Sequence, residues 1–330
     1  MDTLITLLTA PLFGTPAWFW LTFLLIVIGL LVLDLGVLHR DKHEIEMRES
    51  LLLYSGYFSV GVAFGGWIWW QLGATKALEF YTGFLIEQSL SMDNVFVMAA
   101  ILNFFAIPRR YQHRVLFWGI VGVIVLRALM IGLGAALVNN VAWVLYVFGV
   151  FLLISGARML TTQAQQHPDL SENRVLLFFK RHVRITNNTD HGRFLIRQDD
   201  QTLGKSLLYA TPLLLALMLI ELADLVFAMD SVPAVLAISQ DPFIVYTSNI
   251  LAVLGLRALY FALAALMHRF IYLKYALAWV LMFIGGKILL HDLVDVPALL
   301  SLGVTVGLLV GGVLLSLRKT RAPEAENRIA

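Results

Sequence analysis

Five carboxylic acids lie inside stretches of this chain that are otherwise apolar. Glu87 and Asp93 belong to "EQSLSMDN", which stands between "FYTGFLI" and "VFVMAAILNFFAI". Glu221, Asp224 and Asp230 belong to "ELADLVFAMDSVPA". If these stretches cross a membrane, each ionised acid costs roughly 2.5–3.5 kcal/mol at the bilayer centre. The sum, on the order of ten kcal/mol, requires partners for these acids, and a bound cation is one such partner.

The neighbours of these acids indicate which cations could bind. Asn94 and Ser231 directly follow the motif aspartates. Carboxylate, amide, hydroxyl and backbone carbonyl oxygens suit Mg²⁺, Ca²⁺ or Mn²⁺. Met92 and Met229 precede the same aspartates, and a thioether that faced the ion would favour Mn²⁺, whereas a methionine that only packs would leave the metal open. Asp34, near the end of the first apolar stretch, is a weaker candidate because it could reach the membrane interface.

Three basic residues inside apolar stretches offer a structural role for some of the acids. Arg127, Arg257 and Lys287 could each neutralise one acid and brace the site, since a cationic side chain repels a metal ion. If all five acids ionise, two negative charges remain, which suits one divalent cation. We expect no prosthetic group and treat the metal ion as a substrate.

The spacing of the acids predicts an interruption in their helices. Residues six apart on an ideal helix differ by about 240°, so Glu87 and Asp93 would not share a face, whereas Glu221 and Asp224 nearly would. Pro233 has no N–H and clashes with the carbonyl four residues earlier. We therefore expect a broken helix at the second motif, with free carbonyl oxygens available to a cation.

The composition is typical of a membrane protein. Of the 330 residues, 59% are hydrophobic and 14% charged, and the mean hydropathy is +0.81. The absence of cysteine excludes disulfides and thiolate metal sites. Apolar runs of about 20 residues can each cross about 30 Å of hydrocarbon as a helix, and they predict an all-α polytopic membrane protein with about nine transmembrane helices. The expected spans lie near residues 15–38, 51–72, 84–106, 115–138, 141–161, 207–237, 243–266, 275–291 and 297–317.

The distribution of Lys and Arg predicts the orientation. Twenty of the 24 basic residues lie in alternate connections or the C-terminal tail, and only Lys76 lies on the other side. Because cytoplasmic loops are enriched in positive charge, we expect the N-terminus outside and the C-terminus inside, in the cytoplasmic (inner) membrane. The first span follows a segment without Lys or Arg, unlike a cleavable signal peptide, so it is expected to stay as a helix.

An internal repeat predicts the architecture. "LRALMIGLGA" at 126–135 resembles "LRALYFALAA" at 256–265, and "MDNV" at 92–95 resembles "MDSV" at 229–232. Each repeat holds three expected spans, an odd number, so the second would be inverted in the membrane, with a substrate site near the midplane. The expected divisions are two N-terminal transmembrane helices (1–72), a first three-helix repeat (73–161), a basic cytoplasmic linker (162–206) in the form of a loose loop or small surface helix, a second three-helix repeat (207–291), and a last helix with a cytoplasmic tail (292–330).

The motifs resemble the TerC integral membrane family, and within it the Alx-like group. The resemblance rests on "EQSLSMDNVFV", "ELADLVFAMDSVPAVLAI", "DPFIVYTSNILAVLGLRALYF" and "IGGKILL" and covers about residues 80–290. It implies a Mn²⁺ exporter of the cytoplasmic membrane. The acidic site that it implies contains Glu87, Asp93, Glu221, Asp224 and Asp230, and Asn94 and Ser231 occupy the positions after its motif aspartates.

Other functions were weighed against export. An intramembrane aspartyl protease has Tyr-Asp and Gly-x-Gly-Asp, whereas this chain has Met-Asp-Asn and Met-Asp-Ser, so no enzyme is expected. A redox carrier would need cysteines or membrane histidines. A scaffold that assists metal loading of exported proteins, or a stress role without transport, stays open. The expected partners are a divalent cation and the lipid bilayer but no nucleic acid; a homo-oligomer and contacts with membrane or secretion machinery are left open.

Overall fold

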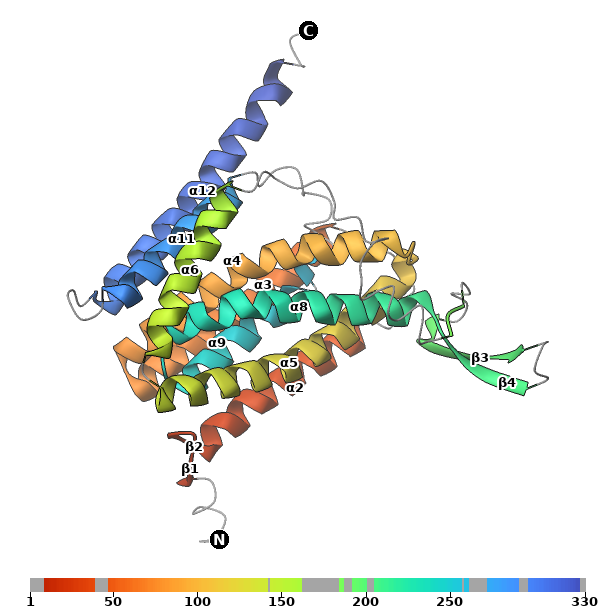
Figure 1. Ribbon diagram of the computed structural model, residues 1–330, viewed down its shortest axis with the longest axis horizontal. Coiled ribbons are helices and arrows are strands. Elements are labelled where there is room, and N and C mark those ends of the chain that lie inside the picture. Colours follow the sequence, from red (N-terminus) through yellow and green to blue (C-terminus); the bar gives the residue numbers. More distant parts are fainter. Residues whose placement is uncertain are drawn as a thin grey trace.

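The computed structural model describes residues 9–38, 47–141, 143–161, 184–186, 192–200, 205–256, 258–260, 272–290 and 296–326. Helices account for most of these residues (Figure 1). Their bounds are α2 Ala17–Leu38, α3 Met47–Leu72, α4 Ala74–Phe104, α5 Arg109–Asn140, α6 Val144–Thr161, α8 Pro212–Leu236, α9 Pro242–Leu254, α11 Leu273–Leu289 and α12 Ala298–Glu326.

The expected fold class, an all-α polytopic membrane protein, is confirmed. Within the described ranges, seven helices are long and apolar enough to cross a membrane: α2, α3, α4, α5, α6, α8 and α12. The shorter α9 and α11 overlap the remaining two expected spans. The number of nine spans therefore stays a prediction. α4 begins ten residues before the expected span at residue 84, and α9 ends twelve residues before the expected end at residue 266.

The linker between the repeats contains a β-hairpin. Strand β3 (Leu195–Asp200) pairs antiparallel with β4 (Lys205–Ala210), and the hairpin projects from the end of the bundle where α8 begins (Figure 1). The expectation of a loose loop or small helix is wrong for this part. Leu195 and Arg197 are exposed while Ile196 and Gln198 are half-buried, the alternation of a strand with two different faces. β4 also runs past residue 206, the expected end of the linker.

Three helix pairs, each from different parts of the chain, hold the bundle together. α4 packs along α9, and α5 packs along α8; α6 packs along α11. The first two pairs are equivalent under the repeat, in which α4 corresponds to α8 and α5 to the segment that contains α9. Reciprocal packing of this kind is what the repeat predicts, and its inverted orientation in a membrane stays a prediction.

A close backbone contact joins α6 to α11. A Cβ on Gly285 would lie 2.7 Å from the carbonyl oxygen of Gly149, and one on Gly149 would lie 3.2 Å from the carbonyl oxygen of Gly285. Only glycine permits this separation, since real Cβ contacts are longer. Together with α12, these helices form a group on one side of α4 and α8 (Figure 1).

The apolar core surrounds a polar centre. One buried cluster joins α4, α5 and α8 and includes Val95, Leu102, Leu116 and Leu219. A second joins α4, α6, α8 and α11 and includes Ile86, Leu152, Ala234 and Ile284. The polar residues described next lie between these clusters along the same helices.

Candidate functional site

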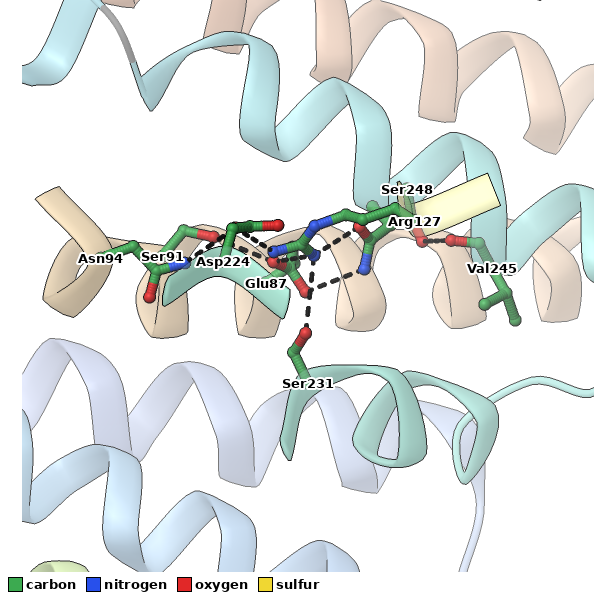
Figure 2. Close-up of polar contacts among 9 residues, drawn as sticks. Glu87, Ser91, Asn94, Arg127, Asp224, Ser231, Val245 and Ser248 are labelled. Carbon is green, nitrogen blue, oxygen red and sulfur yellow. Dashed lines mark hydrogen bonds and ion pairs between the residues drawn. The ribbon is translucent and has the colours of Figure 1, made fainter. Parts of the chain in front are cut away.

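The guanidinium of Arg127 is the centre of a polar cluster inside the bundle. Arg127 lies in α5 and is fully buried. Its Nη1 donates to Glu87 Oε1 of α4, and its Nη2 donates to Asp224 Oδ1 of α8 at 3.2 Å. Nη1 also donates to Asn249 Oδ1 of α9 and, at 3.5 Å, to Ser231 Oγ of α8. One side chain thus connects four helices, and Figure 2 shows it between the two carboxylates.

Both carboxylate oxygens of Glu87 have partners. Oε1 accepts from Arg127 and, at 2.9 Å, from Ser91 Oγ one turn later on α4. Oε2 accepts from Asn249 Nδ2 at 2.8 Å. A metal ion could bind this carboxylate only by displacing one of these donors. In this arrangement Glu87 fixes the positions of Arg127 and α9.

Asp224 and Asn94, by contrast, keep free oxygens. Asp224 Oδ1 accepts from Arg127 and, at 3.4 Å, from Asn94 Nδ2 (Figure 2). Asp224 Oδ2 and Asn94 Oδ1 are buried and have no hydrogen-bond partner among the described residues. A buried polar group without a partner costs about 1–3 kcal/mol, and more when it is charged. Two such acceptors on adjacent side chains mark a position for a cation or a donor.

A cavity of about 320 Å³ opens beside this cluster. Its polar lining comes from α4, α5, α6 and α8 and includes Glu87, Asn94, Arg127, Ser155, Asp230 and Ser231. Asp230 Oδ1 accepts a hydrogen bond from Ser155 Oγ of α6 at 2.9 Å, which holds this half-buried carboxylate at the cavity wall.

Equivalent positions of the repeat face each other across this cavity. Its lining includes Leu90 with Phe227, and Asn94 with Ser231, both pairs at the offset of 137. It also includes Phe151 with Leu281, at the offset of 130. A site formed in this way by both halves is the arrangement that an inverted repeat favours.

Glu221 lies one turn before Asp224 and packs against α5 at a glycine. A Cβ on Gly122 would clash with Glu221 Oε1, so no larger residue fits there without moving the carboxylate. Glu221 Oε2 is buried and has no partner among the described residues. Glu221 therefore supplies a further unused carboxylate oxygen close to the cluster.

Several predicted site residues lie elsewhere. Met229 is 54% exposed, and Met92 packs in the apolar clusters. Asp34 is buried in α2 and is not among the residues that line the cavity. Lys287 lines a second cavity, described below, and not the cavity at Arg127. The side chain of Asp93, and all of Arg257, lie outside the described residues.

The predicted break in the helices is wrong. α4 is continuous through the first motif, and α8 continues through Pro233 to Leu236, because the proline lies in the last turn. No break is needed because the relevant spacing is seven: Glu87 with Asn94, and Asp224 with Ser231. Residues seven apart lie within about 20° of each other on a helix. Two unbroken helices thus turn all four side chains towards Arg127.

Sequence reasoning missed Ser91, Asn249 and Ser155. Ser91 stands four residues after Glu87, a spacing that places two side chains on one helix face. Asn249 lies in the quoted segment "DPFIVYTSNILAVLGLRALYF", as a polar residue within an apolar helix. Ser155 gives no comparable signal. Among the described residues, no group of three or more His, Asp or Glu could hold a metal ion, so the free oxygens of this site come from a mixed set.

Several known proteins are similar to this chain over 90% or more of its length. A curated relative from Rickettsia bellii, described as an uncharacterized membrane protein, is 44% identical over 90% of this chain and 96% of its own length. Another from Myxococcus xanthus is 42% identical over 96% of this chain and 98% of its own length. Alx of Escherichia coli strain K12, whose name proposes a membrane-bound redox modulator, is 41% identical over 90% of this chain and 93% of its own length.

None of these three names is that of an enzyme. No solved structure matches the chain. The family described as "Integral membrane protein TerC family" matches residues 72–324, which contain every residue of the Arg127 cluster and its cavity. By this match and by these relatives, the chain belongs to the TerC family of integral membrane proteins.

Proposed function

We propose that the protein exports divalent metal cations, Mn²⁺ foremost, through the cavity beside Arg127. The observation that carries the proposal is the pair of buried oxygens without partners among the described residues, Asp224 Oδ2 and Asn94 Oδ1. Asn94 lines the cavity, and Asp224, which does not line it, accepts a hydrogen bond from Asn94. A carboxylate in such a place is costly unless a cation visits it. Structural ion pairing explains Glu87, but it leaves these two oxygens unexplained.

The charges around the cavity support a cation as the substrate. Glu87 and Asp224 share the one guanidinium of Arg127, and Glu221 and Asp230 add two more carboxylates. If all four acids ionise, their charge exceeds that of the two arginines at the cavity, Arg127 and Arg158, by two. A divalent ion at Asp224 would offset that excess, because its attraction to carboxylates is strong where water is scarce.

Oxygen donors define the class of metal. Asp224, Asn94, Asp230, Glu221 and Ser231 offer carboxylate, amide and hydroxyl oxygens, which suit Mn²⁺, Mg²⁺ and Ca²⁺. Met229 is too exposed to give the sulfur contact that would separate Mn²⁺ from the others. The choice of Mn²⁺ therefore rests on the resemblance of the acidic motifs to the TerC family, and Ca²⁺ and Mg²⁺ are the competitors to be measured.

Localisation and direction are part of the same proposal. The excess of Lys and Arg in alternate connections supports a cytoplasmic C-terminus and β-hairpin, and with them the cytoplasmic membrane as the location. The cavity beside Arg127 reaches Arg158, in the last turn of α6, and would thus receive the ion from the cytoplasm.

The name of the relative Alx suggests a second role, in redox balance. Thiol chemistry is not available to this chain, because it has no cysteine. A scaffold that assists metal loading of exported proteins is the remaining alternative. It needs no flux of metal through the protein itself, so flux is the measurement that separates the two.

The test is Mn²⁺ flux into proteoliposomes that contain only the purified full chain and a trapped Mn²⁺-sensitive dye. We expect flux with the wild-type chain and a loss of at least tenfold with Asp224→Asn, which keeps the shape and the Arg127 contact but removes the charge. Asp34→Asn is the matched control, a buried membrane acid outside the cavity, and should keep the flux. Wild-type flux no greater than that of protein-free liposomes would refute transport and favour the scaffold.

A further inference from the structure

A second cavity, of about 750 Å³, opens at the other end of the same helices. Both cavities are lined from α4, α6, α8 and α11. On α4 the lining changes from Thr82 in the second cavity to Glu87 in the first, and on α11 it changes from Ile288 to Leu281. By the charge distribution, the second cavity faces the outside of the cell, and we call it the outer cavity.

An apolar layer separates the two cavities. Ile86 of α4, Ala234 of α8 and Ile284 of α11 are almost completely buried and belong to one cluster. The same cluster includes Leu281, which lines the first cavity, and Ile288, which lines the outer one. The two cavities thus lie on either side of a buried apolar cluster that a hydrated ion would not cross in this state.

The outer cavity contains two carboxylates that converge on one cation. Lys76 Nζ lies 3.3 Å from Glu79 Oε2 and also 3.3 Å from Asp241 Oδ2. Ser239 Oγ donates to the same Glu79 oxygen at 2.6 Å. The acids come from α4 and from the segment before α9, so their convergence depends on the fold. A partly exposed ion pair contributes little to stability, so the pairing with Lys76 adds little to the fold beyond the cap that Asp241 forms on α9.

A free oxygen lies in the wall of the same cavity. Ser301 of α12 is 2% exposed, and its Oγ has no partner among the described residues. A buried hydroxyl without a partner needs a ligand or water, as Asp224 and Asn94 do in the first cavity. The outer cavity thus combines two carboxylates, two lysines of the chain itself, of which Lys76 pairs with both carboxylates, and an unused oxygen.

We propose that Glu79 and Asp241 form a release site for a divalent cation and that the ammonium of Lys76 displaces the ion from it. The inference deepens the proposed export function and rests on it for the direction of release. Two carboxylates match the charge of a divalent ion, and one ammonium neutralises only half of that charge. The tethered Lys76 therefore competes with the ion at this position, which weakens binding and promotes release outside.

Mn²⁺ binding to the purified full chain in detergent tests the site directly, with free Mn²⁺ measured by its electron paramagnetic resonance signal. Lys76→Gln removes the competitor and should bind one more Mn²⁺ per chain, at least tenfold more tightly than the wild type does at that position. The gain should survive Asp224→Asn and disappear when Glu79→Gln is added. Glu79 is chosen because Asp241 also caps α9 through Phe243 N. Lys287→Gln, which removes the other lysine of the cavity, is the matched control and should bind as the wild type does.

The outcomes separate the release site from the proposed function. An Mn²⁺ stoichiometry of Lys76→Gln equal to that of the wild type, in protein with an unchanged elution profile, overturns the release site. An additional ion in Lys76→Gln combined with no Mn²⁺ flux in the wild type supports the outer site and overturns export. If both proposals hold, Lys76→Gln should also lower the maximal flux at least fivefold, because the ion is released more slowly.

Discussion

Replacement of Arg127 by methionine should destabilise the protein more than any other single change at the site. The substitution removes the guanidinium from Glu87 and Asp224, which are 0% and 1% exposed. Loss of one partner from a buried ion pair costs about 3–5 kcal/mol, because the remaining charge is left without compensation. At 1.4 kcal/mol per factor of ten, the ratio of folded to unfolded protein falls by about two to three and a half orders of magnitude.

Two further variants test the cause of that loss. Arg127→Lys keeps the charge but not the planar fork, so it cannot reach both carboxylates in the same geometry and should lie between the wild type and Arg127→Met. The triple variant Arg127→Met with Glu87→Gln and Asp224→Asn removes every charge of the cluster. Neutral groups of similar volume often replace buried ion pairs without loss of stability, so this variant should recover folding but not Mn²⁺ flux.

The assay is membrane abundance on a blot, together with the fraction of protein that remains monodisperse after heating in detergent. Arg158→Met is the matched control: Arg158 lines the same cavity but is exposed, and an exposed pair contributes about 0–1 kcal/mol. Wild-type abundance and thermal stability for Arg127→Met would refute the view that Arg127 organises the site. A triple variant no more stable than the single one would show that uncompensated charge is not the cause.

Two other predictions follow from the packing and the charge distribution. Gly122→Ala should abolish Mn²⁺ flux with little loss of stability, since its Cβ would displace the Glu221 carboxylate, which is the end of a flexible side chain. Gly132→Ala on the same helix, where nothing lies within 4 Å, should keep the flux, and equal flux in the two variants would contradict the argument. Reporter fusions at residue 185 should report the cytoplasm and fusions at residue 76 the outside, and an external reading at residue 185 would overturn the inverted repeat and the assignment of the two cavities.

Hydropathy was sufficient to predict which segments form helices. It did not predict the β-hairpin or which cavity each helix end lines. Each expected span overlaps a helix, because a long apolar run has few alternatives to a helix in lipid. The β-hairpin was missed because polar residues lie on both faces of its strands. The sequence therefore shows no clear alternation of apolar and polar residues there. The sequence also does not show which end of a helix lies near which cavity. Lys287 was therefore expected at the acidic site, whereas it lines the outer cavity.

The composition of the site was predicted better than its geometry. Glu87, Asn94, Asp224, Ser231 and Arg127 were all candidates, and the structure brings them together. The prediction of broken helices failed because it compared only the acids, which are six apart in the first motif. The amide and the hydroxyl that follow the aspartates are seven residues from Glu87 and Asp224, and this spacing keeps the helices straight. Asn249 could not be found in this way, because its role depends on the packing of α9 against α4.

If the cavity beside Arg127 binds a cation as proposed, the buried arginine at its wall has a physical purpose. A site of carboxylates alone would hold a divalent ion too tightly for release, whereas conduction and transport require binding that is reversible. Arg127 is fully buried and fixed by several partners, so it sets the affinity permanently. Lys76 is partly exposed, on a flexible stem, and can leave its carboxylates when an ion arrives. On these proposals, Arg127 is a fixed part of the first site and Lys76 a movable competitor at the second, which favours movement of the ion outward.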